Sequence, residues 1–194
     1  MGDLRTESAM ASKLFIVLEG LDGTGKSTQA KLLNQKLSGE LHSTSSLVSK
    51  PRTRFERYDA YMGNNTLISE KTLASNTNNR FVVDRYVAST YASFHAEKYI
   101  HPPTGVKWNE YYPDCIVVPG IIINIELAEH TRLERINQRS KSTDAFENRL
   151  ASNLDFRMCM KNWLRAMSTV TIDATNLSID ELHEVILSVI LELV

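Results

Sequence analysis

The chain has 194 residues, of which 42% are hydrophobic, and its 22 basic residues nearly balance its 23 acidic ones. This composition is typical of one globular domain and argues against a disordered chain or a repeat array. The balanced charge provides no global positive field for sequence-independent binding of nucleic acid, so we expect no nucleic-acid partner.

The chain shows no signal for a membrane or a secretory route. No apolar run approaches the length that spans a bilayer, and residues 1–12 lack the apolar centre of a secretory signal, so we expect a disordered tail there. Cys115 and Cys159 form neither a metal-binding spacing nor a disulfide framework, which suits a reducing compartment. We expect a cytoplasmic protein without a membrane partner, and an organelle such as the mitochondrion stays open.

A glycine-rich motif lies between a predicted strand and a predicted helix. Four apolar residues, 15–18, are typical of a buried strand and run into Gly20-x-x-x-x-Gly25-Lys26-Ser27. A helical pattern of apolar residues follows at once. Strand, glycine turn and helix together are the context that a P-loop requires, so this stretch predicts a cradle for nucleotide phosphates.

The residue types of this motif suit triphosphate binding. The glycines let successive backbone N–H groups and the helix N-terminus point at the phosphates. Lys26 adds a mobile positive charge for the outer phosphates, and Ser27 supplies a hydroxyl for the Mg²⁺ that accompanies ATP. The predicted ATP-binding residues are Gly20, Leu21, Asp22, Gly23, Thr24, Gly25, Lys26, Ser27 and Thr28.

Predicted strands and helices alternate along the rest of the chain. After the P-loop helix, which ends at Ser38-Gly39, further strands are predicted at 47–50, 81–83, 121–125 and 170–172. Predicted helices are two pieces between 55 and 74 joined near Gly63, then 89–99, a helix from about 128, a long helix over 147–164, and a last helix from the capping box Ser178-x-x-Glu181. This alternation predicts an α/β fold with a doubly wound, five-stranded parallel sheet flanked by helices.

Charged residues follow two of the predicted strands at their carboxyl ends, where open α/β sheets bind ligands. Asp84 can hold a metal or its waters, and Arg85 can form bidentate hydrogen bonds with a phosphate. The alternative is a structural Asp–Arg pair that closes the strand. Arg52, Arg54 and Arg57 crowd together after the second predicted strand, where they indicate either an anionic ligand or a solvated basic loop.

Two further patterns remain ambiguous at the level of the residues alone. Asn64 can contact the edge of a base, but a turn asparagine is the simpler interpretation. Arg132, Arg135 and Arg139 are spaced to lie near one helix face, yet Glu129 and Glu134 could balance them on an ordinary solvated helix.

Four local motifs coincide with a known family pattern. They are Glu19-Gly20-x-Asp22-Gly23-x-Gly25-Lys26-Ser27-Thr28-Gln29, Pro51 with nearby arginines, Asp84-Arg85-Tyr86-x-x-Ser89, and Arg132-x-x-Arg135-x-x-x-Arg139. In this order the sequence resembles the thymidylate kinase family from about residue 13 onward. Within that family, Gly63-Asn64, Ser89-Thr90 and the strand after Pro119, followed by Glu129, Leu133 and Arg135, resemble the thymidylate-kinase-like UMP/CMP kinases.

The resemblance implies a reaction. Residues 13–194 would form a P-loop nucleoside monophosphate kinase domain with a mobile lid around 137–147. The enzyme would use ATP and Mg²⁺ to phosphorylate a pyrimidine nucleoside monophosphate (dTMP, or UMP/CMP and their deoxy forms) to the diphosphate, feeding nucleotide synthesis. Homodimers are usual in the family.

The resemblance also implies roles for individual residues. Asp22, Lys26, Arg85 and the lid residues Arg135 and Arg139, with Lys141, would serve catalysis, and Ser27 and Asp84 would bind the metal. The substrate-binding set would be Arg52, Arg54, Arg57, Asn64, Arg85, Ser89 and Tyr91, with the choice between Arg52 and Arg54 for the acceptor phosphate open.

The chain departs from the family pattern at three places. Gly23 stands where some members carry an arginine, and Gly63-Asn64 stands where thymidylate kinases commonly place an arginine against thymine. Ser93 takes the place of an expected aromatic residue, which is shifted to Tyr91 and Phe94. These departures leave the preferred monophosphate open among dTMP, UMP, CMP and their deoxy forms.

Two other functions use the same architecture. A P-loop ATPase or nucleotide switch would show either an Asn-Lys-x-Asp motif or a strand ending in Asp-Glu, and the chain contains neither pattern at the expected place. A deoxynucleoside kinase would direct a carboxylate base at a sugar hydroxyl. The reaction product separates these alternatives.

Overall fold

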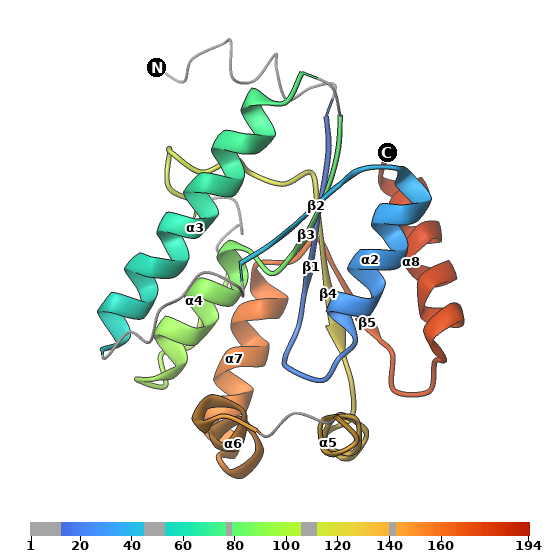
Figure 1. Ribbon diagram of the computed structural model, residues 1–194. Helices are drawn as coiled ribbons and strands as arrows, with labels where there is room; N and C mark the ends of the chain where they lie inside the picture. The colour runs from blue at the N-terminus through green and yellow to red at the C-terminus, as the bar shows by residue number, and fades with distance from the viewer. Residues whose placement is uncertain (1–12, 45–52, 77–78, 106–111, 140–142) are drawn as a thin grey trace.

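The structure is a computed structural model, and it describes residues 13–44, 53–76, 79–105, 112–139 and 143–194. In this part of the chain, five parallel strands form one sheet in the order β2-β3-β1-β4-β5, and helices cover both faces (Figure 1). The predicted doubly wound parallel α/β fold is therefore confirmed. The predicted tail over 1–12 lies outside the described residues.

The central strand of the sheet is the one that leads into the P-loop. β1 (Leu14–Glu19) pairs on one side with β3 (Arg80–Asp84) and on the other with β4 (Ile121–Glu126). The short strands β2 (Glu40–Ser43) and β5 (Val170–Asp173) form the two edges. Because β1 is covered on both faces, its side chains from Phe15 onward are buried, as the continuous apolar run predicts.

The helices form two layers and one end cap. α2 (Lys26–Leu37) and α8 (Ile179–Leu193) cover one face, and α3 (Arg54–Ala74), α4 (Val87–Ala96) and α7 (Leu154–Ala166) cover the other (Figure 1). α5 (Glu129–Asn137) and α6 (Ala145–Ser152) lie beyond the carboxyl ends of the strands. The carboxyl edge is thus enclosed by the P-loop and by the segments that follow β3 and β4.

Two apolar clusters stabilise these layers. One joins the sheet to α2 and α8 and includes Ile16, Leu33 and Ile186; the other joins it to α3, α4 and α7 and includes Tyr86 and Trp163. Burial of large apolar side chains contributes roughly 1.5–3 kcal/mol each, so both layers hold the sheet firmly.

The second strand lies earlier in the chain than predicted. β2 spans Glu40–Ser43, whereas the predicted strand at 47–50 falls outside the described residues. Ser38 takes a left-handed conformation, and a Cβ on Gly39 would come within 2.7 Å of the Arg80 carbonyl oxygen. The chain therefore enters the sheet directly after α2. As a half-buried edge strand, β2 carries little of the apolar pattern that identifies a strand.

The region around Gly63 is one continuous helix, not two pieces. α3 runs unbroken from Arg54 to Ala74 and begins at a capping box between Thr53 and Glu56. A glycine inside a helix costs about 1 kcal/mol relative to alanine. The capping box and the burial of Ile68 and its neighbours on one helix face offset that cost, so the glycine does not end the helix.

The predicted long helix over 147–164 is two helices. α6 begins at the capping box of Asp144 and ends before Asn153, whose backbone is extended (φ −116°, ψ 105°). The Asn153 side chain then accepts a hydrogen bond from the Phe156 amide at 2.9 Å and caps α7. Asparagine at this position favours a helix start over continuation, and the apolar periodicity on both sides concealed the break. The last predicted helix is confirmed, with Ser178 and Glu181 forming its capping box.

No helix in the described part of the chain is long and apolar enough to cross a membrane.

Candidate active site

A polar chamber of about 360 Å³ lies where the P-loop meets the carboxyl end of β3. Its walls come from three places: the glycine turn with the start of α2, the end of β3, and the segment after α5. The lining residues are Asp22, Gly23, Gly25, Lys26, Ser27, Thr28, Asp84, Arg85 and Arg139. The predicted P-loop and the predicted Asp84-Arg85 pair therefore share one cavity, although they are far apart in the sequence.

The P-loop has the geometry that its glycines allow. Gly20 has φ +143°, and a Cβ there would lie 2.4 Å from the Ile125 carbonyl oxygen, so no other residue fits without moving β4. Gly25, at φ +95°, precedes the first residue of α2, and no side chain caps this helix among the described residues. The first turn of α2 lines the chamber, and its backbone amides, which have no acceptor within the helix, could bind phosphate oxygens there.

Lys26 is buried within the P-loop, with 4% of its surface exposed. Its Nζ donates to the Leu21 carbonyl oxygen at 2.6 Å. Burial lowers the pKa of the Lys26 ammonium group, and the neighbouring charge of Arg85 lowers it further, to about 7, against an opposing effect of nearby carboxylates. A phosphate group in the chamber would favour the charged form of Lys26.

Asp22 and Arg85 form an ion pair across the chamber. Arg85 Nη2 lies 2.6 Å from Asp22 Oδ1, and Arg85 Nη1 donates to Ser89 Oγ at 3.1 Å and to the Gly20 carbonyl oxygen at 3.3 Å. Burial by itself would raise the pKa of Asp22, but the charges of Arg85 and Lys26 outweigh it and lower that pKa to about 2. Asp22 is therefore a carboxylate that holds the guanidinium group in place.

The backbone at Arg85 is itself unusual. Its φ is +68°, in the left-handed region that residues other than glycine rarely adopt. The Arg85 amide donates to the Leu18 carbonyl oxygen at 3.0 Å, and the Thr44 hydroxyl donates to the Arg85 carbonyl oxygen at 3.2 Å. Residues kept in such a conformation by their surroundings often occur at functional sites. Here the turn directs the guanidinium group toward the P-loop.

Asp84 has the properties of a metal-binding carboxylate. It is 7% exposed, and its buried Oδ1 has no hydrogen-bond partner among the described residues. The Ser27 hydroxyl group belongs to the same chamber. A carboxylate and a hydroxyl group beside a phosphate cradle match the oxygen ligands that Mg²⁺ prefers, so these residues fit the predicted metal site.

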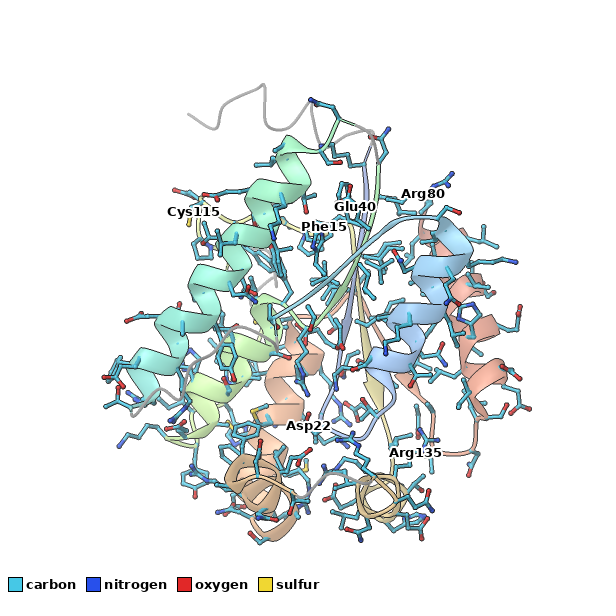
Figure 2. All side chains as sticks on the ribbon, viewed as in Figure 1. Phe15, Asp22, Glu40, Arg80, Cys115 and Arg135 are labelled. Atoms are coloured by element: carbon cyan, nitrogen blue, oxygen red, sulfur yellow. The ribbon has the colours of Figure 1, made fainter. Side chains whose placement is uncertain are left out.

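The three spaced arginines occupy different environments. Arg139 lines the chamber, is 43% exposed, and pairs with Glu147 at 3.1 Å. Arg135 Nη1 lies 3.8 Å from the position that a Cβ would take on Gly25. Figure 2 shows Asp22 and Arg135 at the same end of the sheet. Arg135 and Arg139 are thus both close to the P-loop.

Arg132 is buried beneath the P-loop instead, with 1% of its surface exposed. It donates to both carboxylate oxygens of Glu129, at 2.9 and 2.6 Å, and to the Asp22 carbonyl oxygen at 2.9 Å. Its guanidinium group therefore connects α5 to the glycine turn. The regular spacing of the three arginines conceals this difference.

The arginines at the start of α3 do not line the chamber. Arg57 forms an ion pair with Glu97, just beyond α4. Arg54 packs against two aromatic rings, with its Cζ 4.7 Å from the ring centroid of Phe55 and 4.6 Å from that of Phe94. Arg52 and Lys141 fall outside the described residues. The question whether Arg52 or Arg54 binds the acceptor phosphate therefore stays open.

The other predicted substrate residues lie on α3 and α4. Asn64 is buried on α3, and its Nδ2 has no hydrogen-bond partner in the described part of the chain. Tyr91, on α4, packs between Tyr58 and Trp163, with ring centroids 6.0 and 6.1 Å away. Ser89 contacts Arg85 at the chamber wall. An amide donor and aromatic faces are groups that can bind a base.

Sequence reasoning assigned no function to Glu19, the last residue of β1. Its side chain is fully buried and contacts the turn that carries Arg85. One signal was present in the sequence, because a charged residue directly follows the apolar run 15–18 that predicts a buried strand. A buried carboxylate requires partners, and only the fold shows which groups these are.

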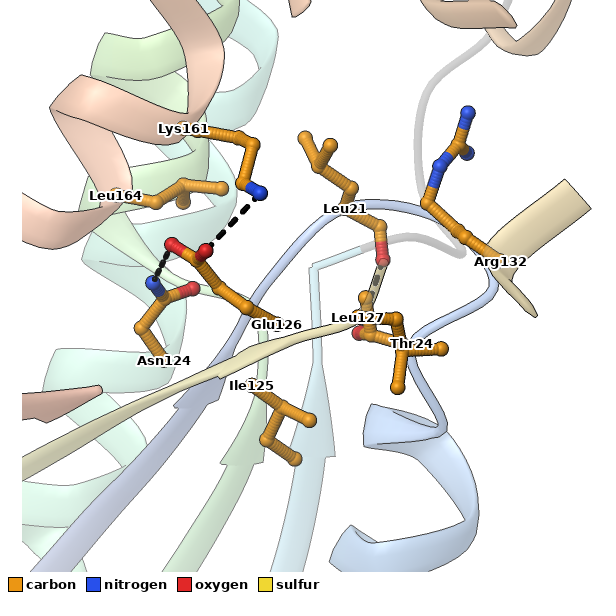
Figure 3. A pocket seen from close by; sticks show the side chains of 9 residues that line it. All are labelled: Leu21, Thr24, Asn124, Ile125, Glu126, Leu127, Arg132, Lys161 and Leu164. Carbon is orange, nitrogen blue, oxygen red and sulfur yellow. Dashed lines mark hydrogen bonds and ion pairs between the residues drawn. The ribbon is translucent and has the colours of Figure 1, made fainter. Parts of the chain in front are cut away.

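A second, much smaller cavity of about 10 Å³ lies behind the P-loop (Figure 3). Its lining includes Leu21 and Thr24 of the P-loop and the ion pair between Glu126 and Lys161. This volume is close to that of a single water molecule. The large chamber is therefore the candidate substrate site.

The chain is similar to known thymidylate kinases in sequence and in fold. No protein-family model matches the chain. A thymidylate kinase of Leptospira interrogans is 29% identical over 154 residues, which cover 69% of this chain and 74% of the relative. A probable thymidylate kinase of Methanocaldococcus jannaschii is 28% identical over 194 residues, covering 92% of this chain and 96% of the relative.

A probable thymidylate kinase of Thermoplasma acidophilum is 28% identical over 148 residues, which cover 70% of this chain and 76% of the relative. The solved structure of a thymidylate kinase from Candida albicans has the same fold, with a TM-score of 0.65 and 18% identity over 93% of this chain and 92% of that one. The curated relatives, together with the shared fold, support the membership of this chain in the thymidylate kinase family.

Proposed function

We propose that the chain is a nucleoside monophosphate kinase that transfers the γ-phosphoryl group of ATP to a pyrimidine nucleoside monophosphate. dTMP is the first acceptor to test, because the curated relatives are named thymidylate kinases. One observation carries the proposal: the phosphate cradle and the Arg85 guanidinium group face the same chamber. Transfer between two nucleotides requires two anion-binding elements side by side.

The chemical problem is repulsion between two phosphate tails. Lys26, Arg85 and Arg139 place positive charge on three sides of the chamber. Two of these groups are largely buried, where electrostatic interactions are stronger than in water. The attacking oxygen of the acceptor phosphate is already anionic at neutral pH, so the transfer needs alignment and charge neutralisation instead of a general base.

Asp22 and Arg85 would act as one unit toward the acceptor phosphate. The short contact between them fixes one nitrogen of the guanidinium group, and Ser89 and the Gly20 carbonyl oxygen contact the other. An arginine with its orientation set in advance loses less conformational freedom when it binds a phosphate. Asp22 thereby orders the acceptor site.

Ser27 and Asp84 would hold Mg²⁺ beside the donor phosphates, because their oxygens share the chamber and the Asp84 Oδ1 is otherwise unpartnered in the described structure. When bound, Mg²⁺ supplies charge neutralisation on the donor phosphates.

The acceptor base would lie between α3 and α4, against Asn64 and Tyr91. The Nδ2 of Asn64, which has no hydrogen-bond partner among the described residues, is a donor, and the carbonyl oxygens of thymine and uracil are acceptors. The three departures from the family pattern, at Gly23, Gly63-Asn64 and Ser93, make UMP, CMP and their deoxy forms the other acceptors to compare.

The test is a coupled assay with ATP, Mg²⁺ and each pyrimidine monophosphate, followed by chromatographic identification of the products. We expect ADP and the nucleoside diphosphate in equal amounts, with dTMP as a substrate. Lys26→Ala should lower turnover by roughly 100-fold or more. Lys31→Ala removes an exposed lysine from the same helix and serves as the matched control.

Other products would contradict the proposal. Free inorganic phosphate without a diphosphate product would indicate an ATPase or nucleotide switch. Phosphorylation of a nucleoside, with no reaction of monophosphates, would indicate a deoxynucleoside kinase.

A further inference from the structure

The buried carboxylate of Glu19 replaces the missing cap of another element. The first residue before α4 is Tyr86, whose side chain caps no amide, and the first turn of α4 contains no acidic residue. Glu19 Oε1 accepts hydrogen bonds from the amides of Tyr86, at 2.9 Å, and Ser89, at 3.2 Å. A side chain from β1 thus accepts hydrogen bonds from the N-terminal amides of α4, a role that the side chain of the N-cap residue usually fills.

The second oxygen of this carboxylate controls the Ser89 hydroxyl group. Glu19 Oε2 accepts a short hydrogen bond from Ser89 Oγ. A hydroxyl group has one proton and two lone pairs, so once its proton is donated to Glu19 it can only accept from its other neighbours. The neighbour is Arg85 Nη1, at 3.1 Å. The Glu19 carboxylate therefore determines which group donates and which accepts in the two hydrogen bonds that link Glu19, Ser89 and Arg85.

The same strand also holds the backbone on the other side of Arg85. The Leu18 carbonyl oxygen accepts from the Arg85 amide, and the next residue, Glu19, binds the amide of Tyr86. The left-handed conformation of Arg85 is thus held by two consecutive residues of β1. Without these contacts, relaxation of the turn would move the guanidinium group away from the chamber.

We propose that Glu19 is a positioning residue for phosphoryl transfer, which holds the Arg85 turn and orients the Ser89 hydroxyl group so that Arg85 faces the acceptor phosphate. The inference rests on the proposed function and adds a residue that does not itself line the chamber. Glu19→Gln is the decisive variant, because it keeps the shape of the side chain. If its oxygen keeps the two amides, its NH₂ group must donate to Ser89 Oγ, so the Ser89 proton loses its acceptor on residue 19 and the orientation of the hydroxyl group is no longer fixed.

The first measurement needs no catalytic activity. Hydrogen–deuterium exchange should show amides within residues 85–89 exchanging roughly tenfold faster in Glu19→Gln, since neutral acceptors bind N–H groups more weakly than a carboxylate. The matched control is Glu126→Gln, which changes a buried carboxylate at the end of neighbouring strand β4 that pairs with Arg165 instead. This control should leave exchange over 85–89 unchanged.

The second measurement is a double-mutant cycle in the kinase assay. Glu19→Gln should lower kcat/KM for the acceptor by roughly 10- to 100-fold in the wild-type background. In an Arg85→Met background, Glu19→Gln should lower kcat/KM for the acceptor by less than about threefold, because Glu19 acts through Arg85. A fall of equal size in both backgrounds, or an equal fall in Glu126→Gln, would overturn the proposal, as would unchanged exchange over 85–89.

The two proposals fail differently. Faster exchange in Glu19→Gln with no diphosphate product from the wild-type protein would contradict the kinase function and support the contact of Glu19 with the Arg85 turn. A wild-type kinase whose Glu19→Gln variant keeps its acceptor kinetics would contradict the positioning role alone.

Discussion

Arg132 and Arg139 belong to the same series of spaced arginines, but the structure predicts that replacing Arg132 will mainly lower stability and that replacing Arg139 will mainly lower turnover. Arg132→Met removes a buried guanidinium group with three hydrogen bonds, two to Glu129 and one to the Asp22 carbonyl oxygen. Removing one partner of a buried ion pair costs about 3–5 kcal/mol. The lower value applies here, because Glu129 is 29% exposed and keeps Arg157 at 3.4 Å.

That cost converts into a change in thermal stability. For a protein of this length, each kcal/mol lowers Tm by about 2–4 °C, so a loss of about 3 kcal/mol should lower it by about 6–12 °C. Arg139→Met removes a half-exposed guanidinium group whose pair with Glu147 contributes about 0–1 kcal/mol. Its Tm should change by less than about 4 °C, while turnover falls roughly 100-fold because Arg139 lines the chamber.

The assay combines thermal unfolding by circular dichroism with steady-state kinetics, both variants being measured at a temperature well below the lower Tm. An Arg132→Met protein with wild-type Tm would refute the buried-clamp interpretation. An Arg139→Met protein with wild-type turnover would refute the placement of Arg139 in the catalytic chamber.

Two further predictions concern carboxylates. Burial would raise the pKa of Glu126, but its bonds to Arg165 and Lys161 outweigh this and lower it. The interactions of ionised Glu126 therefore stabilise the fold above the ordinary pKa of 4.5, and this stabilisation is lost as the pH falls through the lower pKa of the folded state. Because Glu126→Gln removes the titrating group, the Tm of this variant should decline less steeply below about pH 4.5. An equally steep decline in the variant would contradict this. Asp84→Asn should lower turnover by roughly 100-fold and shift the Mg²⁺ dependence of the kinase activity to higher Mg²⁺ concentrations. An unchanged Mg²⁺ dependence would exclude Asp84 as a metal ligand. Ser27→Ala is a second test of the same site.

Much of the scaffold could be predicted from local sequence. The P-loop strand, turn and helix are contiguous, and each part follows from short-range patterns in apolar spacing and glycine placement. The capping box at Ser178 and the buried strand at 121–125 are equally local. The predictions that were wrong concern interruptions, namely the intact helix at Gly63 and the break at Asn153, where tertiary packing and capping outweigh propensity.

Only the tertiary structure decided which charged side chains serve the chamber. Arg132 and Arg139 differ little in sequence pattern, yet one is buried against the P-loop and the other is half exposed. Glu19 and Ser89 lie on different elements, and their contact exists because parallel pairing brings the ends of β1 and β3 together. A buried ion or hydrogen bond depends on partners distant in the chain and on the loss of water around them, and neither quantity is present in the local sequence.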